Sequence, residues 1–101
     1  MKQLGFALVL LPAIFLAWPS AATGLYECAA TDRAAWKSTD QVKDKLKADG
    51  WSVRHVKEDG GCYEAYGTSP EGQRVEAYVH PVTLEVMLIA RRGEILFRKE
   101  Q

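Results

Sequence analysis

Residues 51–66 decide the fold, and they read Trp51-Ser-Val-Arg-His-Val-Lys-Glu-Asp-Gly-Gly-Cys-Tyr-Glu-Ala-Tyr66. Valine and aromatic residues recur within this stretch, and both favour β-strands. Two such runs, 51–58 and 62–66, flank Asp59-Gly60-Gly61. Glycines adopt the positive φ angles that a tight hairpin turn requires. The stretch therefore predicts two antiparallel strands joined by a hairpin.

Three more strand-like segments follow, and a turn precedes each of them. The first alternates cleanly, with Val75, Ala77 and Val79 facing one way, and Pro81 ends it because proline cannot donate to a ladder. The second is the most apolar run outside the N-terminal segment, which predicts a strand that is buried on both faces or covered by a helix. Short turns join antiparallel strands, whereas parallel strands need long crossovers, so the predicted sheet is antiparallel. The three segments are residues 74–80, 86–90 and 95–97, and the turns are 69–72, 80–83 and 91–94.

One helix is predicted on the N-terminal side of the hairpin. Ser38-Thr-Asp-Gln41 has the pattern of a capping box, and Gly50 supplies a natural stop. Val42 and Leu46 lie four residues apart on one side, and lysines fill the rest, which we interpret as a solvated surface. We therefore expect an α+β fold in which one short amphipathic helix, residues 39–49, packs on an antiparallel sheet of three to five strands.

The first 22 residues differ from the rest of the chain. Lys2 gives a positively charged start, an uncharged apolar run spans residues 4–18, and Ser20-Ala21-Ala22 supplies small residues. This is the pattern of a secretory signal peptide that is cleaved after Ala22. The apolar run is shorter than the roughly 20 residues that span a bilayer, so we expect no membrane insertion after cleavage. The expected organisation is a signal peptide at 1–22, a lead-in segment at 23–37 and a folded domain at 38–101.

Charge is balanced along the chain, with 13 basic and 13 acidic residues out of 101. Removing residues 1–22 leaves 79 residues with 12 basic and 13 acidic groups. A chain so close to neutrality gives no electrostatic reason to expect nucleic acid as a partner. A domain of this size buries one modest core and usually needs an additional cross-link.

The two cysteines, Cys28 and Cys62, supply that cross-link. Export places both in an oxidising compartment, where the single possible pairing within the chain is a disulfide between them. A lipid anchor at Cys28 fits less well because Tyr26 and Glu27 precede it instead of small residues. A catalytic or metal-binding thiol lacks a supporting Cys-x-x-Cys pattern or a nearby histidine.

The sequence contains no pattern that is typical of an active site. His55 and His80 are 25 residues apart in strand-like stretches, and a metal site requires three or four ligands. Glycine-rich phosphate loops and nucleophile-elbow patterns are absent from the sequence. We therefore expect no catalytic residue, no metal and no cofactor, and we do not expect an enzyme.

Aromatic residues are the better candidates for function. Trp36 and Trp51 are expected to pack in the core. Tyr63, Tyr66 and Tyr78 are candidate protein-binding residues, because aromatic side chains are enriched at binding hot spots. If Tyr66 and Tyr78 are cross-strand neighbours, they line an exposed face of the sheet. Such a face, or an unpaired edge strand, is a place where an extended peptide can add.

An ordered set of residues over positions 28–90 resembles the PepSY family, and in particular its small exported single-domain members. No single piece of the set is diagnostic, but the order of the pieces is. The pieces are Trp36, Ser38, Leu46, Gly50, Trp51-Ser-Val53, Gly61-Cys62-Tyr63-Glu64, the strand Gly72-x-Arg-Val-Glu-Ala-Tyr78, and Pro81-Val-Thr83 followed by Glu85-Val86.

The turn around residue 81 departs from the family pattern, which reads Asp-Pro-x-Thr-Gly-Glu. Pro81, Thr83 and Glu85 match it, whereas His80 stands for the aspartate and Leu84 for the glycine. Leucine adopts a positive φ angle only at a cost, so the turn geometry is in question. Residues 91–101 lie beyond the resemblance.

The resemblance implies a protein that binds other proteins, because PepSY domains occur in propeptides of secreted metallopeptidases and alone in cell-envelope proteins. We expect a bacterial periplasmic or secreted, non-catalytic module that binds a protein or peptide and modulates or inhibits a peptidase. Two alternatives stay open. One is an accessory or sensory subunit that docks on a membrane-bound partner through Arg91-Arg92 or the tail. The other is a binder of a small apolar ligand between helix and sheet.

Overall fold

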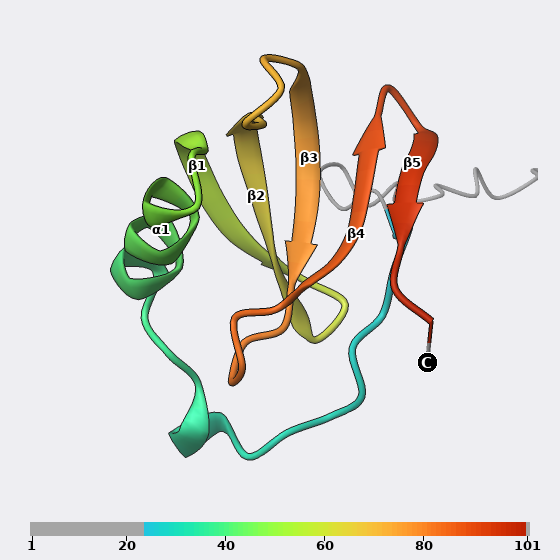
Figure 1. The fold of residues 1–101 in the computed structure, drawn as a ribbon. Coiled ribbons are helices and arrows are strands. Elements are labelled where there is room, and N and C mark those ends of the chain that lie inside the picture. The colour runs from blue at the N-terminus through green and yellow to red at the C-terminus, as the bar shows by residue number, and fades with distance from the viewer. Residues whose placement is uncertain (1–23, 101) are drawn as a thin grey trace, which may run out of the picture.

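The computed structural model describes residues 24–100, and these form one helix on a five-stranded sheet (Figure 1). The predictions that fall on residues 1–22 lie outside the described part of the chain. The elements are the short 3-10 helix η1 (Arg33–Ala35), α1 (Thr39–Ala48), β1 (Ser52–Asp59), β2 (Cys62–Thr68), β3 (Arg74–Val79), β4 (Val86–Arg91) and β5 (Glu94–Arg98). This confirms the predicted α+β class.

Helix α1 begins and ends where the local sequence dictates. The Ser38 hydroxyl accepts from the Gln41 N–H (3.1 Å), and the Gln41 side chain accepts from the Ser38 N–H (2.8 Å), which completes the capping box. At the other end Gly50 adopts a φ of 99°, and Trp51 N–H donates back to the Leu46 carbonyl (2.9 Å). The helix ends at Ala48, one residue before the predicted end.

The sheet is an antiparallel meander in the order β1-β2-β3-β4-β5. Its first turn is the predicted one: Gly60 and Gly61 have φ angles of 61° and 79°, as a tight hairpin requires. Strand β2 runs two residues past the predicted end and includes Gly67. The last strand, predicted at 95–97, spans Glu94–Arg98.

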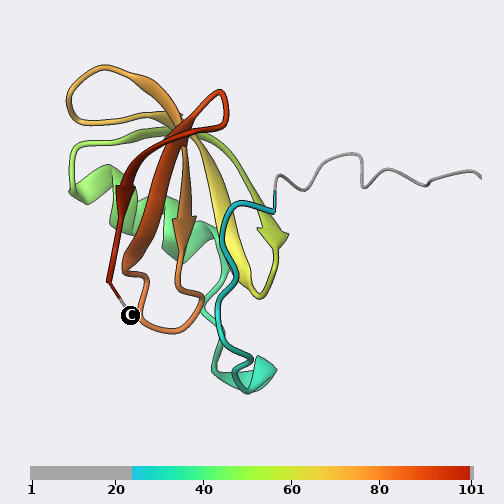
Figure 2. The same cartoon turned by 90° about the vertical axis from the view of Figure 1, so that its right-hand side faces the viewer.

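One face of the sheet forms the main core against α1. Val42 and Leu46 are fully buried there against Val75, Ala77 and Val79, as the alternation in β3 predicts. Trp51 is buried in the same cluster, and Trp36 packs edge-on against Tyr63, with 5.2 Å between ring centroids. Figure 2 shows α1 behind the sheet.

The other face is partly covered by the lead-in segment, which the sequence did not predict. Tyr26 and Cys28 are buried against Tyr78 and Leu88, and Cys28 is bonded to Cys62 as expected. In Figure 2 this segment passes in front of the sheet, on the side opposite α1. The sheet is therefore the middle of three layers over part of its length.

Candidate functional site

Tyr63 packs in the interior. Its side chain is 5% exposed on the α1 face, and its hydroxyl donates to the Lys37 carbonyl (2.5 Å). Burial raises the pKa of the hydroxyl, and Glu58 raises it further, so the group stays protonated. The tyrosine joins the start of α1 to the sheet. The ring of Tyr63 has almost no exposed area, so Tyr63 is not among the contact residues of the function proposed below.

Tyr78 is also buried, on the opposite face. Its hydroxyl donates to Asp59 Oδ2 (2.8 Å) and accepts from the Leu25 N–H (3.2 Å), and the Gly24 N–H lies 3.4 Å from the same carboxylate oxygen. Tyr78 and Asp59 thus hold the beginning of the lead-in segment on the sheet. The segment covers this part of the face, so the conditional expectation that Tyr66 and Tyr78 together line an exposed face does not hold at Tyr78.

Tyr66 is the one tyrosine of the three that is half-exposed. It lies opposite Glu76 in the β2–β3 pair, whereas Tyr78 lies opposite Glu64, so the two tyrosines are diagonal neighbours on one face. The ring of His55 lies 5.9 Å from the ring of Tyr66. Tyr66 therefore keeps its place as a candidate contact residue.

Glu64 lies fully buried between these tyrosines and was not predicted. Its carboxylate is 3.8 Å from Lys57 Nζ on β1, and burial raises its pKa, although the Tyr66 hydroxyl bonded to it lowers the pKa in part. Burial and the charge of Glu64 in turn raise the pKa of Tyr66. The sequence does indicate this burial. Glu64 is two residues from Cys62, so both side chains lie on the same face of the strand.

Replacing Glu64 by glutamine is expected to stabilise the domain increasingly as the pH rises above 4.5. In the unfolded chain this carboxyl ionises near 4.5, whereas in the folded chain its pKa is higher, so the folded state holds the proton longer. Wild type therefore loses stability between the two pKa values, and the glutamine variant does not. Urea unfolding from pH 4 to pH 8 measures both. A stability difference that stays constant over this range would contradict the assignment; Glu76→Gln is the control on the same face.

The turn that departs from the family pattern keeps an acceptor at its first position. Nδ1 of His80 accepts from the N–H groups of Val82 (3.1 Å) and Thr83 (3.2 Å). An aspartate carboxylate accepts the same kind of backbone hydrogen bonds in such a turn. The Thr83 hydroxyl accepts from the Glu85 N–H (3.2 Å), and the Glu85 carboxylate pairs with Lys99. The histidine is therefore a turn acceptor.

Leu84 occupies the glycine position of that turn with a φ of 65°. A left-handed conformation costs a residue with a side chain about 1–2 kcal/mol. The leucine side chain packs against the main core next to Val86, and this burial offsets part of the cost. The turn thus keeps the conformation of a glycine while adding a side chain to the core.

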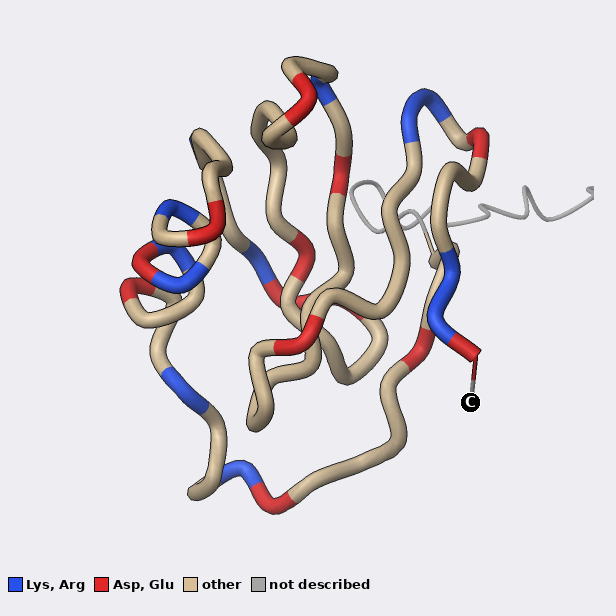
Figure 3. Tube along the Cα trace, in the orientation of Figure 1, with Lys and Arg blue, Asp and Glu red and all other residues tan. Residues whose placement is uncertain are grey.

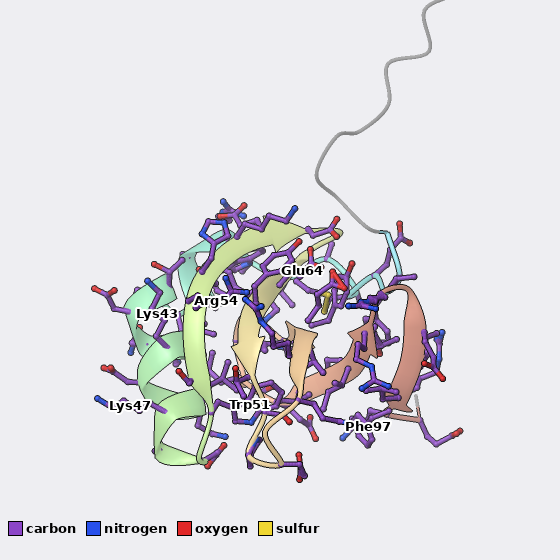
Figure 4. All side chains as sticks on the ribbon, turned by 90° about the horizontal axis from the view of Figure 1, so that it is seen from above. Lys43, Lys47, Trp51, Arg54, Glu64 and Phe97 are labelled. Atoms are coloured by element: carbon purple, nitrogen blue, oxygen red, sulfur yellow. A yellow bond between two sulfur atoms is a disulfide. The ribbon has the colours of Figure 1, made fainter. Side chains whose placement is uncertain are left out.

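Strand β5 carries the exposed large apolar side chains of the described residues. Ile95, Leu96 and Phe97 are 42%, 39% and 46% exposed, and they follow one another along an edge of the sheet. Phe97 lies opposite Ile89, which belongs to the α1 face, but α1 lies beside β1 at the far edge of the sheet. Figure 4 shows this separation, with Lys43 and Lys47 of α1 at one end and Phe97 at the other.

The described residues contain neither a cluster of metal ligands nor a helix that could cross a membrane. Between residues 24 and 100, no three His, Cys, Asp or Glu side chains gather where they could hold an ion. In the same range, no helix has the length and apolar character that crossing a bilayer requires.

Comparison with known proteins identifies the family of this chain. The family model of the peptidase propeptide and YPEB domain, PepSY, matches residues 5–89, a range that includes α1 to β3 and most of β4 and leaves out β5. The comparisons with curated proteins and with solved structures found no match. The matched range takes in the capped helix, the hairpin and the His80–Glu85 turn described above. The chain belongs to the PepSY family.

Proposed function

We propose that this chain is an exported module that binds an extended segment of a peptidase, without catalysis of its own, and modulates or inhibits that peptidase in the bacterial periplasm or outside the cell. Its family is named for peptidase propeptides, which supports a peptidase as the partner. The signal-like residues 1–22 support export, so the working chain begins at residue 23. In it the disulfide ties the lead-in segment 23–37 to the domain 38–101.

The observation that carries this proposal is the exposed edge of β5. An edge strand presents backbone N–H and C=O groups that a further strand can bond, and β-strand addition is a common way to bind an extended peptide. Three consecutive apolar residues on this edge, Ile95 to Phe97, supply contact area beside those hydrogen bonds. Exposed apolar residues that follow one another along an edge mark a candidate interaction site.

Photo-crosslinking in cells that export the chain tests the proposal. A photoreactive phenylalanine analogue replaces Phe97 in one variant and Lys47, on the outer side of α1, in the control variant. We expect the Phe97 position to capture one envelope protein with a peptidase domain and the Lys47 position to capture none. The captured peptidase is then purified and assayed with the exported chain.

A double variant, Ile95→Lys with Phe97→Lys, completes the test. Lysines on an edge strand discourage strand addition, and both positions are exposed, so the fold is expected to survive. Loss of two apolar contacts at the interface is expected to weaken binding about tenfold or more. Capture of a membrane protein without a peptidase domain, or equal binding by the double variant, would refute the proposal as stated.

A further inference from the structure

A hollow of about 900 Å³ opens on the part of the sheet that the lead-in segment leaves uncovered. Its lining comes from β1, β2, β3 and the β4–β5 turn, and it includes the half-exposed Tyr66 and its cross-strand partner Glu76. Tyr26 and Cys28 cover the neighbouring part of the same face. The hollow therefore lies next to the first residues of β5.

Four arginines line this hollow and make it basic: Arg54, Arg74, Arg91 and Arg92. Two carboxylates, Glu76 and Glu94, share the lining, so the positive groups are in excess. Figure 3 shows the basic positions at the start of β3 and in the β4–β5 turn gathered at the same end of the sheet.

None of these four guanidinium groups has an ion pair, a side-chain hydrogen bond or an aromatic ring as partner within residues 24–100. The remaining arginines are engaged. Arg33 pairs with Glu58 (2.8 Å), and Arg98 lies over the ring of Tyr26 (5.9 Å). The hollow thus gathers cations that the fold itself does not neutralise.

The conformation of the β4–β5 turn does not explain why residue 92 is an arginine. Arg92 and Gly93 have φ angles of 52° and 84°, the pair of positive values that a tight hairpin turn requires. Asparagine or glycine suits the first of these positions, and a residue such as arginine is strained there. Residues held in such conformations cluster at functional sites, which directs attention to what the side chain does.

We propose that this hollow binds carboxylate side chains of the same polypeptide segment that β5 binds, so that the partner segment is acidic where it passes the β4–β5 turn. This rests on the function proposed above and adds the chemistry of the partner. Arginine recognises carboxylates with two parallel hydrogen bonds, and Arg91 pairs with Glu94 where β4 ends and β5 begins, on either side of the Arg92-Gly93 turn. A strand added along β5 therefore passes these arginines where β5 begins.

An acidic polypeptide fits the hollow better than an anionic membrane does. The exposed guanidinium groups surround a hollow, and Glu76 and Glu94 lie among them. A flat anionic surface would meet those carboxylates as well as the arginines, whereas individual carboxylate side chains can reach each arginine separately.

Titration of the exported, disulfide-bonded chain with synthetic hexaglutamate, followed by NMR of the backbone amides, tests this assignment. Hexaglutamine is the uncharged matched peptide, and vesicles of phosphatidylglycerol are the membrane arm. We expect hexaglutamate to shift the amides of residues 72–76 and 91–94, hexaglutamine to leave them in place, and added salt to weaken the binding.

Three variants make the test specific: Arg92→Asn, Arg74→Gln and, as charge-matched control on the outer side of α1, Lys47→Gln. We expect each arginine variant to weaken hexaglutamate binding about tenfold and the lysine variant to leave it within about twofold. Arg92→Asn is also expected to raise the melting temperature by a few degrees, because asparagine suits the turn. Weaker binding by a more stable protein excludes misfolding as the cause.

Several results would overturn the assignment. Equal binding by Arg92→Asn, Arg74→Gln and Lys47→Gln would show a general charge effect, and binding to the vesicles without binding to hexaglutamate would identify a membrane site. The function proposed above fails separately, since it rests on capture at Phe97. Capture of a peptidase at Phe97 with no hexaglutamate binding would leave the β5 edge in place and remove the acidic partner segment.

Discussion

Replacing Cys28 and Cys62 by alanine is expected to lower the free energy of unfolding by about 4 kcal/mol. The bridge closes a loop over a sequence separation of 34 residues, and the chain entropy that it removes from the unfolded state corresponds to about this value. A domain of this size has a total stability of roughly 4–12 kcal/mol, so the variant loses a large fraction of it. Urea unfolding of both proteins under oxidising conditions measures the difference.

The same substitution is expected to release the lead-in segment from the sheet. Tyr26 and Cys28 then no longer cover Tyr78 and Leu88, so the amide of Leu25 exchanges with solvent faster than the amides of β3. Wild type treated with a reductant under denaturing conditions and refolded serves as the control, since it lacks the bridge but keeps both thiols. A loss below about 1 kcal/mol in both proteins would show that the lead-in segment docks without the bridge.

Replacing Gly67 by alanine is expected to cost at least about 3 kcal/mol, because the new methyl group would meet backbone atoms that cannot move aside. A Cβ at this position would lie 2.2 Å from the Ser52 carbonyl oxygen and 2.9 Å from Val53 Cα. Gly67 pairs with Val53, and the register of β1 shifts directly after that pair, so the two strands approach closely here. Thermal and urea unfolding measure the loss.

The matched control for this substitution is Gly72→Ala. Gly72 has a φ of 90° and no atom within 4 Å of the position of a Cβ, so alanine there meets a conformational cost of about 1 kcal/mol and no clash. Equal losses at the two positions would contradict the close approach of β1 to β2. A large loss at Gly67 alone would support it.

The elements that the sequence predicted are those whose signals are local. The capping box at Ser38, the paired glycines of the first hairpin and the alternation in β3 each depend on neighbouring residues, and all three are confirmed. The predicted β2 ended two residues too early, because glycine, here Gly67, has a low intrinsic preference for β-strands. What makes Gly67 part of the strand is the approach of β1, a contact that no local pattern contains.

The candidate site was predicted less well because exposure depends on what covers each face. Tyr66 and Tyr78 share a face by simple alternation, yet the lead-in segment buries only Tyr78. That segment has no periodic apolar pattern by which its docking could be foreseen. The arginines of the hollow come from three separate parts of the chain, so only the sheet brings them together.

The buried position of Cys62 also sets an order for the final steps of maturation. Its sulfur has no exposed area once the lead-in segment is in place, so an oxidising enzyme can reach it only before that segment docks. In the export proposed above, Cys28 reaches the oxidising compartment before Cys62, so the disulfide forms only after residue 62 has followed. Formation of the disulfide and docking of the lead-in segment as the third layer are therefore coupled.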